Sequence, residues 1–257
     1  MNQIALNSDV AEGFGAWSFG DDDGILEHVT AANVACGFHA GDPSTIRSVC
    51  AKAAERSVTI GAQVSYRDLV GFGRRFMGIS RVDLVNDLIY QIGALRIFAE
   101  IAGSTISYVK AHGALYNVAA RNEEHAKAIV EAVATASTGL PVLCQPETET
   151  WKAAVAAGIT PLAEVFADRA YTAEGLLVDR SQHGAVVTDP EEVADRCLQM
   201  VTQRTVRAIT GETVEFGQPP AAICIHSDTP GASLIAARVA RNMRAHGVEL
   251  VGIGVRT

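Results

Sequence analysis

The sequence predicts a parallel β/α barrel, closed or nearly closed, that forms a single domain over residues 1–257. Short apolar runs alternate with amphipathic helical segments, which is the pattern of parallel strands joined by helical crossovers. Polar residues follow at least five of these runs, whereas an open doubly wound sheet gathers its site at one switch point. A chain of 257 residues with 48% hydrophobic content can also bury one large core. The barrel is therefore favoured, and the open sheet is the alternative.

Local signals place the strands and the starts of several helices. Asp42 and Asp189 each precede a proline, an arrangement that caps and opens a helix, and Ser80 with Asp83 resembles a capping box. The predicted strands lie at 4–7, 31–36, 58–62, 106–110, 141–144, 160–165 and 221–226, with weaker candidates at 185–187 and 248–253.

The longest predicted helix runs from Arg81 to Ala102. Its apolar side chains recur near helical spacing, so we expect this face to pack on the sheet. The residues of the face are Val82, Val85, Leu88, Ile89, Ile92, Leu95 and Phe98.

Composition restricts the kinds of partner that the chain can have. A net charge of −8 argues against nucleic acid and anionic membranes, since neither surface attracts an acidic protein. The five cysteines form no CxxC pair and suit reduced, buried thiols, which favours a cytoplasmic location. We see neither a signal peptide nor an apolar run of the roughly 20 residues that a membrane span needs. Self-association into a homo-oligomer is left open.

Two strand ends carry the same chemistry. After residues 31–36 come His39 and the helix-capping Asp42, and after residues 221–226 come His226 and Asp228. Each histidine is interpreted as functional, the alternative being a hydrogen-bonded core residue. The first strand adds Asp9, with Glu12 following. These two carboxylates suit a general base and a cation ligand, or else a solvated loop that caps the next helix.

Further charged residues are expected to face the barrel interior or its mouth. Lys110 and His112 alternate along one strand and so share a face, where an interior ammonium needs a carboxylate such as Asp9 or Glu164, or a ligand. Arg74, in a glycine-rich loop, suits binding of a carboxylate or phosphate, although a surface arginine is the plain alternative. The sixth strand carries Glu164 and is followed by Asp168 and Arg169, a charged run that serves either catalysis or loop bracing.

Several familiar motifs are missing from the sequence. It has no GxxxxGK[ST] loop, so binding of ATP by this chain alone is unsupported, and no GxSxG, HExxH or CxxC. Metal binding stays open, because His39, His112, His226 and Asp9 would meet if their strands converge, but no two histidines have local ligand spacing.

The chain resembles the LamB/YcsF family over nearly its whole length. The motifs are Asn33 to Asp42 (NVACGFHAGD), Gly71 to Arg75 (GFGRR), Val109 to Asn117 (VKAHGALYN), Val165 to Arg169 (VFADR) and Arg180 to Gln182 (RSQ).

The resemblance implies an irregular, seven-stranded β/α barrel of the glycoside hydrolase and deacetylase type. It further implies an ATP-dependent 5-oxoprolinase that works with separate B and C subunits and cleaves 5-oxo-L-proline, a lactam, to L-glutamate. ATP is then the cofactor of the complex, while a role for a divalent metal stays open. The alternatives are a metal-dependent, deacetylase-like hydrolase and a non-catalytic subunit that binds substrate or organises the complex.

Roles for the candidate residues follow from lactam hydrolysis. We expect Asp9 or His39 to orient or deprotonate water, and Lys110 with His112 to stabilise the developing negative charge. Arg74 is expected to hold the substrate carboxylate. The full candidate set comprises Asp9, His39, Lys110, His112, Glu164 and Asp168 as catalytic residues, and Glu12, Arg74, Arg169, His226 and Asp228 as substrate-binding residues.

The chain also departs from the family pattern at several positions. Ala5 stands where the family usually has Asp, and Gln63 stands where it usually has His, so one strand-end imidazole is missing. Gln63 donates hydrogen bonds but cannot shuttle a proton and is a poor metal ligand. Ala11 and Ser227 replace usual glycines and Ala111 a usual proline.

Overall fold

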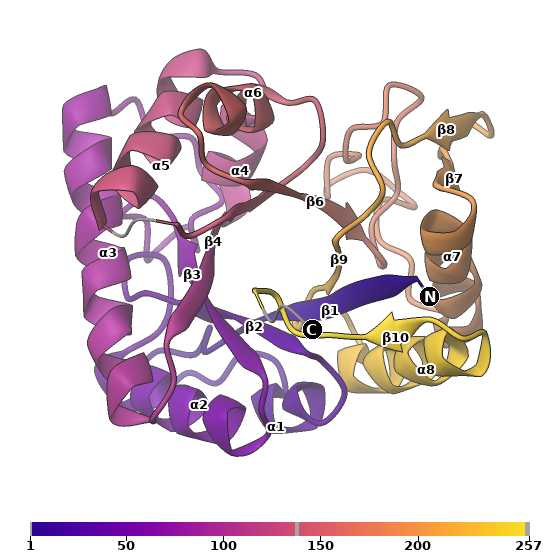
Figure 1. The fold of residues 1–257 in the computed structure, drawn as a ribbon, viewed down its shortest axis with the longest axis horizontal. Helices are drawn as coiled ribbons and strands as arrows, with labels where there is room; N and C mark the ends of the chain where they lie inside the picture. The colour runs from indigo at the N-terminus through magenta and orange to yellow at the C-terminus, as the bar shows by residue number, and fades with distance from the viewer. Residues whose placement is uncertain (1, 137–138, 255–257) are drawn as a thin grey trace.

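The computed structural model describes residues 2–136 and 139–254, which contain a closed barrel of seven parallel strands (Figure 1). Each strand pairs with the next, and the last barrel strand, β9, pairs with both β6 and β1. This closure confirms the predicted barrel and excludes the open sheet. The barrel strands are β1 (Gln3–Val10), β2 (Ala31–Ala35), β3 (Thr59–Val64), β4 (Ile106–Ala111), β5 (Val142–Cys144), β6 (Pro161–Phe166) and β9 (Ala222–Ile225).

Helices surround the barrel, and capping side chains start several of them as predicted. The carboxylate of Asp42 accepts hydrogen bonds from the backbone N–H groups of Ser44 and Thr45 at 2.9 and 3.2 Å, and Asp189 caps its helix in the same way. The helices are α1 (Asp22–Leu26), α2 (Pro43–Glu55), α3 (Arg81–Ile101), α4 (Gly113–Ala119), α5 (Glu123–Ala136), α6 (Glu149–Ala156), α7 (Pro190–Thr202) and α8 (Ala232–Ala245).

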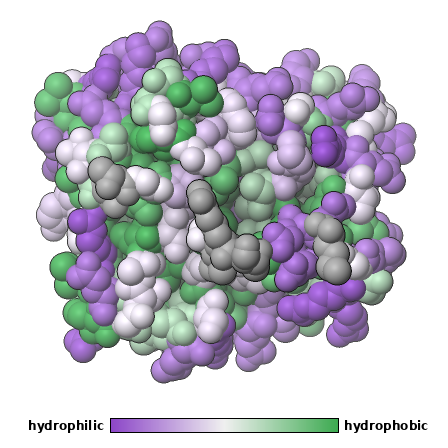
Figure 2. Space-filling model, in the orientation of Figure 1, coloured by the Kyte–Doolittle hydropathy of each residue, from purple (hydrophilic) through white to green (hydrophobic). Residues whose placement is uncertain are grey.

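Helix α3 is apolar on more of its circumference than the predicted single face. Val85, Leu88, Ile92 and Leu95 are buried, but Val82 is 70% exposed, so its assignment to the packed face was wrong. At 3.6 residues per turn, Val82 lies about 120° around the helix from Leu88 and therefore faces away from the core. Figure 2 shows hydrophobic side chains at the edge of the molecule where α3 lies in Figure 1. Among the described residues, no helix is both long and apolar enough to cross a membrane.

Two weaker strand predictions need correction. Residues 185–187 form no strand, because they lie in the long segment between β6 and α7, where Val186 makes only an isolated bridge to Arg169. The predicted strand 248–253 shortens to β10 (Glu249–Leu250), which pairs with the start of β1. An antiparallel hairpin, β7 (Thr205–Arg207) with β8 (Thr213–Glu215), was not predicted.

The barrel interior is apolar at one end and polar at the other. Side chains near the strand starts form a small core cluster around Tyr108, which we call the barrel floor. Gly61 leaves room for the Tyr108 ring, since a Cβ at this position would lie 2.2 Å from it. Two residues further along each strand, on the same face, the interior becomes polar. The buried residues of the floor are Ala5, Ala31, Tyr108, Leu143, Ala222 and Ile253.

Candidate active site

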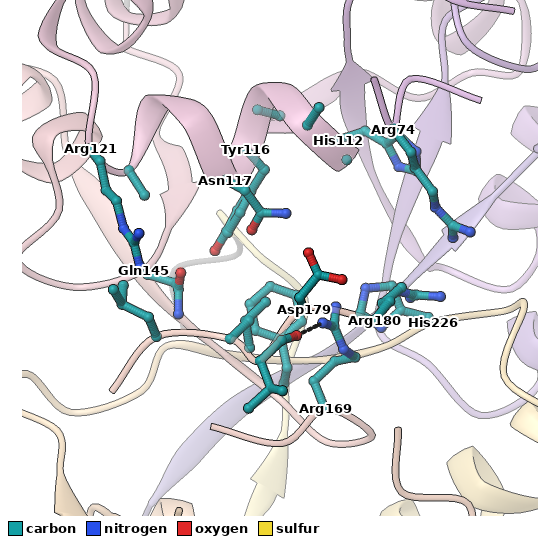
Figure 3. A pocket seen from close by; sticks show the side chains of 18 of the residues that line it. Arg74, His112, Tyr116, Asn117, Arg121, Gln145, Arg169, Asp179, Arg180 and His226 are labelled. Atoms are coloured by element: carbon teal, nitrogen blue, oxygen red, sulfur yellow. Dashed lines mark hydrogen bonds between the residues drawn. The ribbon is translucent and has the colours of Figure 1, made fainter. Parts of the chain in front are cut away.

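A cavity of about 570 Å³ opens at the carboxyl ends of the barrel strands (Figure 3). This is the end of a β/α barrel at which ligands bind, because the loops that follow the strands converge there. Figure 3 shows Arg74, Arg180 and His226 on one side of the cavity, with Arg121 and Gln145 on the other. Six of the predicted site residues line the cavity: Asp9, Arg74, Lys110, His112, Arg169 and His226.

Lys110 is the buried cation of the site. Its ammonium Nζ lies 2.8 Å from Oε1 of Glu164, 3.2 Å from Oδ1 of Asp9 and 3.1 Å from Sγ of Cys224. Burial acts to lower the pKa of Lys110, but the carboxylates of Asp9 and Glu164 outweigh burial, and the pKa is raised well above its ordinary value. The expected salt bridge is therefore present with both acids, and Lys110 stays charged.

Asp9 is held as a carboxylate by its neighbours. Burial acts to raise its pKa, but the charge of Lys110 and a hydrogen bond from Asn33 lower it below the ordinary range. Nδ2 of Asn33 donates to Oδ1 of Asp9 at 2.8 Å and to Oδ1 of Asn7 at 2.7 Å. The hydroxyl of Tyr108 in turn donates to Oδ1 of Asn33 at 2.6 Å. This chain of hydrogen bonds fixes the orientation of Asp9.

Glu12, His39 and the cavity-lining His112 surround the side chain of Gln63. The carboxamide of Gln63 lies 3.0 Å from Oε1 of Glu12, 3.0 Å from Nδ1 of His112 and 3.2 Å from Nε2 of His39. The two imidazole rings stack with their centroids 4.2 Å apart. Burial lowers the pKa of His39 to about 4 and that of His112 well below its ordinary value. Both rings are thus neutral at pH 7.

The pKa values of Glu12 and Asp9 are shifted in opposite directions. Burial and the neighbouring charge of Asp9 raise the pKa of Glu12 well above its ordinary value, whereas the pKa of Asp9 is lowered. Pairs of acids whose pKa values are shifted in opposite directions are common where one acts as a general acid and the other as a base. Only Asp9 of the two lines the cavity, and Glu12 lies beneath it.

His226 and Asp168 form a hydrogen-bonded dyad at the cavity wall. Nδ1 of His226 donates to Oδ1 of Asp168 at 2.9 Å, which leaves Nε2 as the nitrogen available to the cavity. Thr229 also donates to Asp168, and Phe166 stacks on the imidazole with centroids 5.5 Å apart. Burial acts to raise the pKa of Asp168, but His226 and these hydrogen bonds hold it low. Asp168 is therefore a carboxylate that orients His226.

The arginines at the mouth differ in how their charge is balanced. Arg74 and Arg180 both bind the carboxylate of Asp228, so this acid links the loops that follow β3, β6 and β9. Arg169 is 5% exposed and donates to the backbone carbonyls of Ala185 and Val178. Across residues 2–136 and 139–254, no acid lies within ion-pair distance of it. Burial, with the charge of Arg180 nearby, lowers the pKa of Arg169 to about 10, which leaves it a cation.

The structure thus brings the predicted residues together at one barrel end, in different positions. Glu12, His39, Glu164 and Asp168 lie behind the lining residues, and Asp228 lies at the rim. Sequence reasoning missed Asn7 and Asn33 as orienting residues, although Asn7 alternates with Asp9 and so shares its face. Other lining residues that it did not single out are Tyr116, Asn117, Arg121, Gln145, Phe166 and Arg180.

Comparison with known proteins agrees with the barrel and its site. The A subunit of 5-oxoprolinase from Streptomyces coelicolor is 53% identical over 251 residues, which cover 98% of each chain. The solved structure of a lactam utilization protein from Thermus thermophilus is 40% identical and has a TM-score of 0.92, covering 97% of this chain and 99% of that one. The polysaccharide deacetylase Bc1974 from Bacillus cereus has a TM-score of 0.53 at 11% identity, over 98% of this chain and 92% of that one, a likeness of fold alone.

The family profile covers both ends of the barrel and every candidate residue. The profile of the LamB/YcsF family matches residues 4–256, and the Thermus and Streptomyces proteins are similar to this chain over almost the same length. The chain therefore belongs to the LamB/YcsF family.

Proposed function

We propose that this chain is the A subunit of an ATP-dependent 5-oxoprolinase, which opens the lactam ring of 5-oxo-L-proline to L-glutamate with separate B and C subunits. The names of the Streptomyces and Thermus relatives support a lactam substrate. The observation that carries the proposal is the ammonium of Lys110, 3.2 Å from the ionised Asp9, at the cavity wall. This pair offers a positive charge to a carbonyl oxygen and a base beside it.

ATP is assigned to the partner subunits, because the sequence has no phosphate-binding GxxxxGK[ST] loop. A five-membered lactam is stabilised by resonance and recloses readily, so its hydrolysis needs both activation and a driving force. Phosphorylation of the amide oxygen supplies both. A reducing, cytoplasmic compartment suits a protein whose five cysteines are all buried free thiols.

Arg169 is the residue that we assign to the substrate carboxylate. Arg74, the residue expected for this role from the sequence, already shares Asp228 with Arg180. Arg169 lines the cavity and carries a charge that neutral carbonyls do not balance. A carboxylate beside its guanidinium gains charge-assisted hydrogen bonds. Arg74 then contributes to the local positive charge and, through Asp228, links the loops at the cavity mouth.

Lactam opening is assigned to Asp9, Lys110 and His226. Lys110 stabilises the negative charge at the phosphorylated amide oxygen, and Glu164 keeps its ammonium in place. Asp9 orients and deprotonates the water that adds to the carbonyl carbon. The C–N bond then breaks, and the proton that the water gave to Asp9 passes to the ring nitrogen through Nε2 of His226, which Asp168 orients. A second water releases phosphate from the resulting acyl phosphate, which leaves glutamate.

His39 and His112 hold this assembly in position through their hydrogen bonds. Both ring nitrogens of His112 are hydrogen-bonded, to Gln63 and to the backbone carbonyl of Phe72. His39 does not line the cavity. We therefore assign these two histidines to positioning rather than to proton transfer.

The proposal is tested by measuring ATP-dependent release of glutamate from 5-oxoproline by this chain with its B and C subunits. The measurement is repeated with each subunit left out in turn. Lys110→Met should abolish turnover with the complex still assembled, whereas Lys152→Met, on the exposed face of α6, should leave turnover unchanged. Near-normal turnover by Lys110→Met would remove Lys110 from the mechanism. Full turnover by B and C alone would instead make this chain a non-catalytic, organising subunit.

A further inference from the structure

The strongest feature that the proposed reaction leaves unused is the hydrogen-bond centre formed by Gln63. Its side chain is fully buried, as is His39, and Glu12 and His112 are each about 5% exposed. One carboxamide thus joins three side chains that come from the loops after β1, β2 and β4.

The direction of each hydrogen bond around Gln63 follows from its partners. Nε2 of His112 must carry a proton, because it lies 3.0 Å from the carbonyl oxygen of Phe72. Nδ1 of His112 is therefore an acceptor, and the Gln63 amide donates to it and to Oε1 of Glu12. Oε1 of Gln63 then accepts from Nε2 of His39. Every polar atom of the carboxamide is used.

The same three partners have the composition and spacing of a metal site. One oxygen of Glu12 and one nitrogen each of His39 and His112 all lie within 4.8 Å of one another. Oε1 of Glu12 is 3.4 Å from Nδ1 of His112, and neighbouring ligands of a tetrahedral zinc ion are about 3.4 Å apart, given bonds of about 2.1 Å. Two imidazoles and one carboxylate suit Zn²⁺ or Co²⁺.

We propose that Glu12, His39 and His112 form a site for a divalent transition metal ion, and that the carboxamide of Gln63 fills this site in the present chain. A metal would need the lone pair on Nδ1 of His112 that Gln63 occupies, and His39 would have to release the proton on Nε2. The site therefore does not accept an ion while Gln63 is in place.

A second group of donors is filled in the same manner. Asp9, Cys224 and His226 also offer ligand atoms within 4.8 Å of one another. The ammonium of Lys110 lies 3.2 Å from Asp9 and 3.1 Å from Cys224, and it would repel a metal cation. Both donor groups thus hold a side chain of the protein where an ion would sit, so the barrel works without a resident metal at either place.

The experiment compares metal binding by the wild type and by three Gln63 variants. Gln63→Ala removes the carboxamide, and Gln63→His adds a fourth donor of similar size. Both should bind about one equivalent of Co²⁺ or Zn²⁺, seen by ligand-field absorption, by calorimetry and by a rise in Tm with the ion. Gln63→Leu, which fills the same space without an amide, is the matched control and should bind none.

The identity of the ligands is checked in a second background. Adding His39→Ala to Gln63→Ala should remove the metal signal, because one of the three donors is lost. The proposal is overturned if the wild type binds a stoichiometric ion that a chelator removes, or if folded Gln63→Ala and Gln63→His both fail to bind one. These readouts do not depend on turnover, so they are separate from the test of the 5-oxoprolinase assignment.

Discussion

Removing the charge of Lys110 should destabilise the fold in a way that depends on pH. In the wild type the ammonium lies 2.8 and 3.2 Å from the carboxylates of Glu164 and Asp9. Lys110→Met keeps the apolar stem and leaves two buried acids without their cation. Breaking a buried ion pair from one side costs about 3–5 kcal/mol, so the free energy of unfolding at pH 8 should fall by about that amount.

The sign of the pH dependence follows from the direction of each pKa shift. In the wild type the lowered pKa of Asp9 gives stability that is lost as pH falls through the folded pKa, and the raised pKa of Lys110 gives stability that is lost only at high pH. Burial already raises the pKa of Glu164 in the wild type, and without the cation it raises the pKa of Glu164 further and that of Asp9 as well. The deficit of the variant relative to the wild type is then smallest at low pH and grows as pH rises.

The assay is urea unfolding followed by circular dichroism at pH 5 and pH 8. The deficit of Lys110→Met should be smaller at pH 5 by at least about 1.4 kcal/mol, the free energy of one pKa unit. Adding Glu164→Gln should restore part of the stability at pH 8, because only one buried acid then remains. Lys152→Met is the exposed control. Equal deficits at both pH values, or no recovery in the double variant, would refute the reasoning.

Three further variants, one of them with a matched control, test the remaining contacts. Asp168→Asn should lower kcat by about 10²–10⁴-fold with KM little changed, because the histidine that it orients loses its partner; an unchanged kcat contradicts the dyad. Arg169→Met should raise KM for 5-oxoproline by about 10–100-fold, the loss of a charged hydrogen bond, and an unchanged KM places the carboxylate elsewhere. Gly61→Ala should destabilise the fold by about 1–3 kcal/mol through contact with Tyr108, whereas Gly93→Ala, in open space on α3, should stabilise it by about 0.5–1 kcal/mol; equal effects in urea unfolding would contradict the packing of the floor.

Features that depend on local order along the chain were predictable from the sequence. The alternation of strands and helices, the caps at Asp42 and Asp189, and the shared face of Lys110 and His112 all follow from neighbours within a few residues. The need of Lys110 for an acid was also predictable, since an interior ammonium must be paired.

Features that depend on distant contacts were not predictable. Asn33 in an apolar strand carries no sign that Asp9, 24 residues earlier, will lie 2.8 Å from it. From the sequence, Gln63 is notable only because the family usually has His at this position. Its three hydrogen-bond partners come together only when the barrel closes. The β7–β8 hairpin has three residues in each strand, too few for alternation to show.

The two ends of the barrel interior differ in packing. Within residues 2–136 and 139–254, Tyr108 and its apolar neighbours fill the floor, and the cavity opens at the opposite end. Substrate and product must therefore pass through the same cavity mouth, so product must leave before the next substrate binds. A protein that covered the cavity mouth would therefore control both the entry of substrate and the release of product.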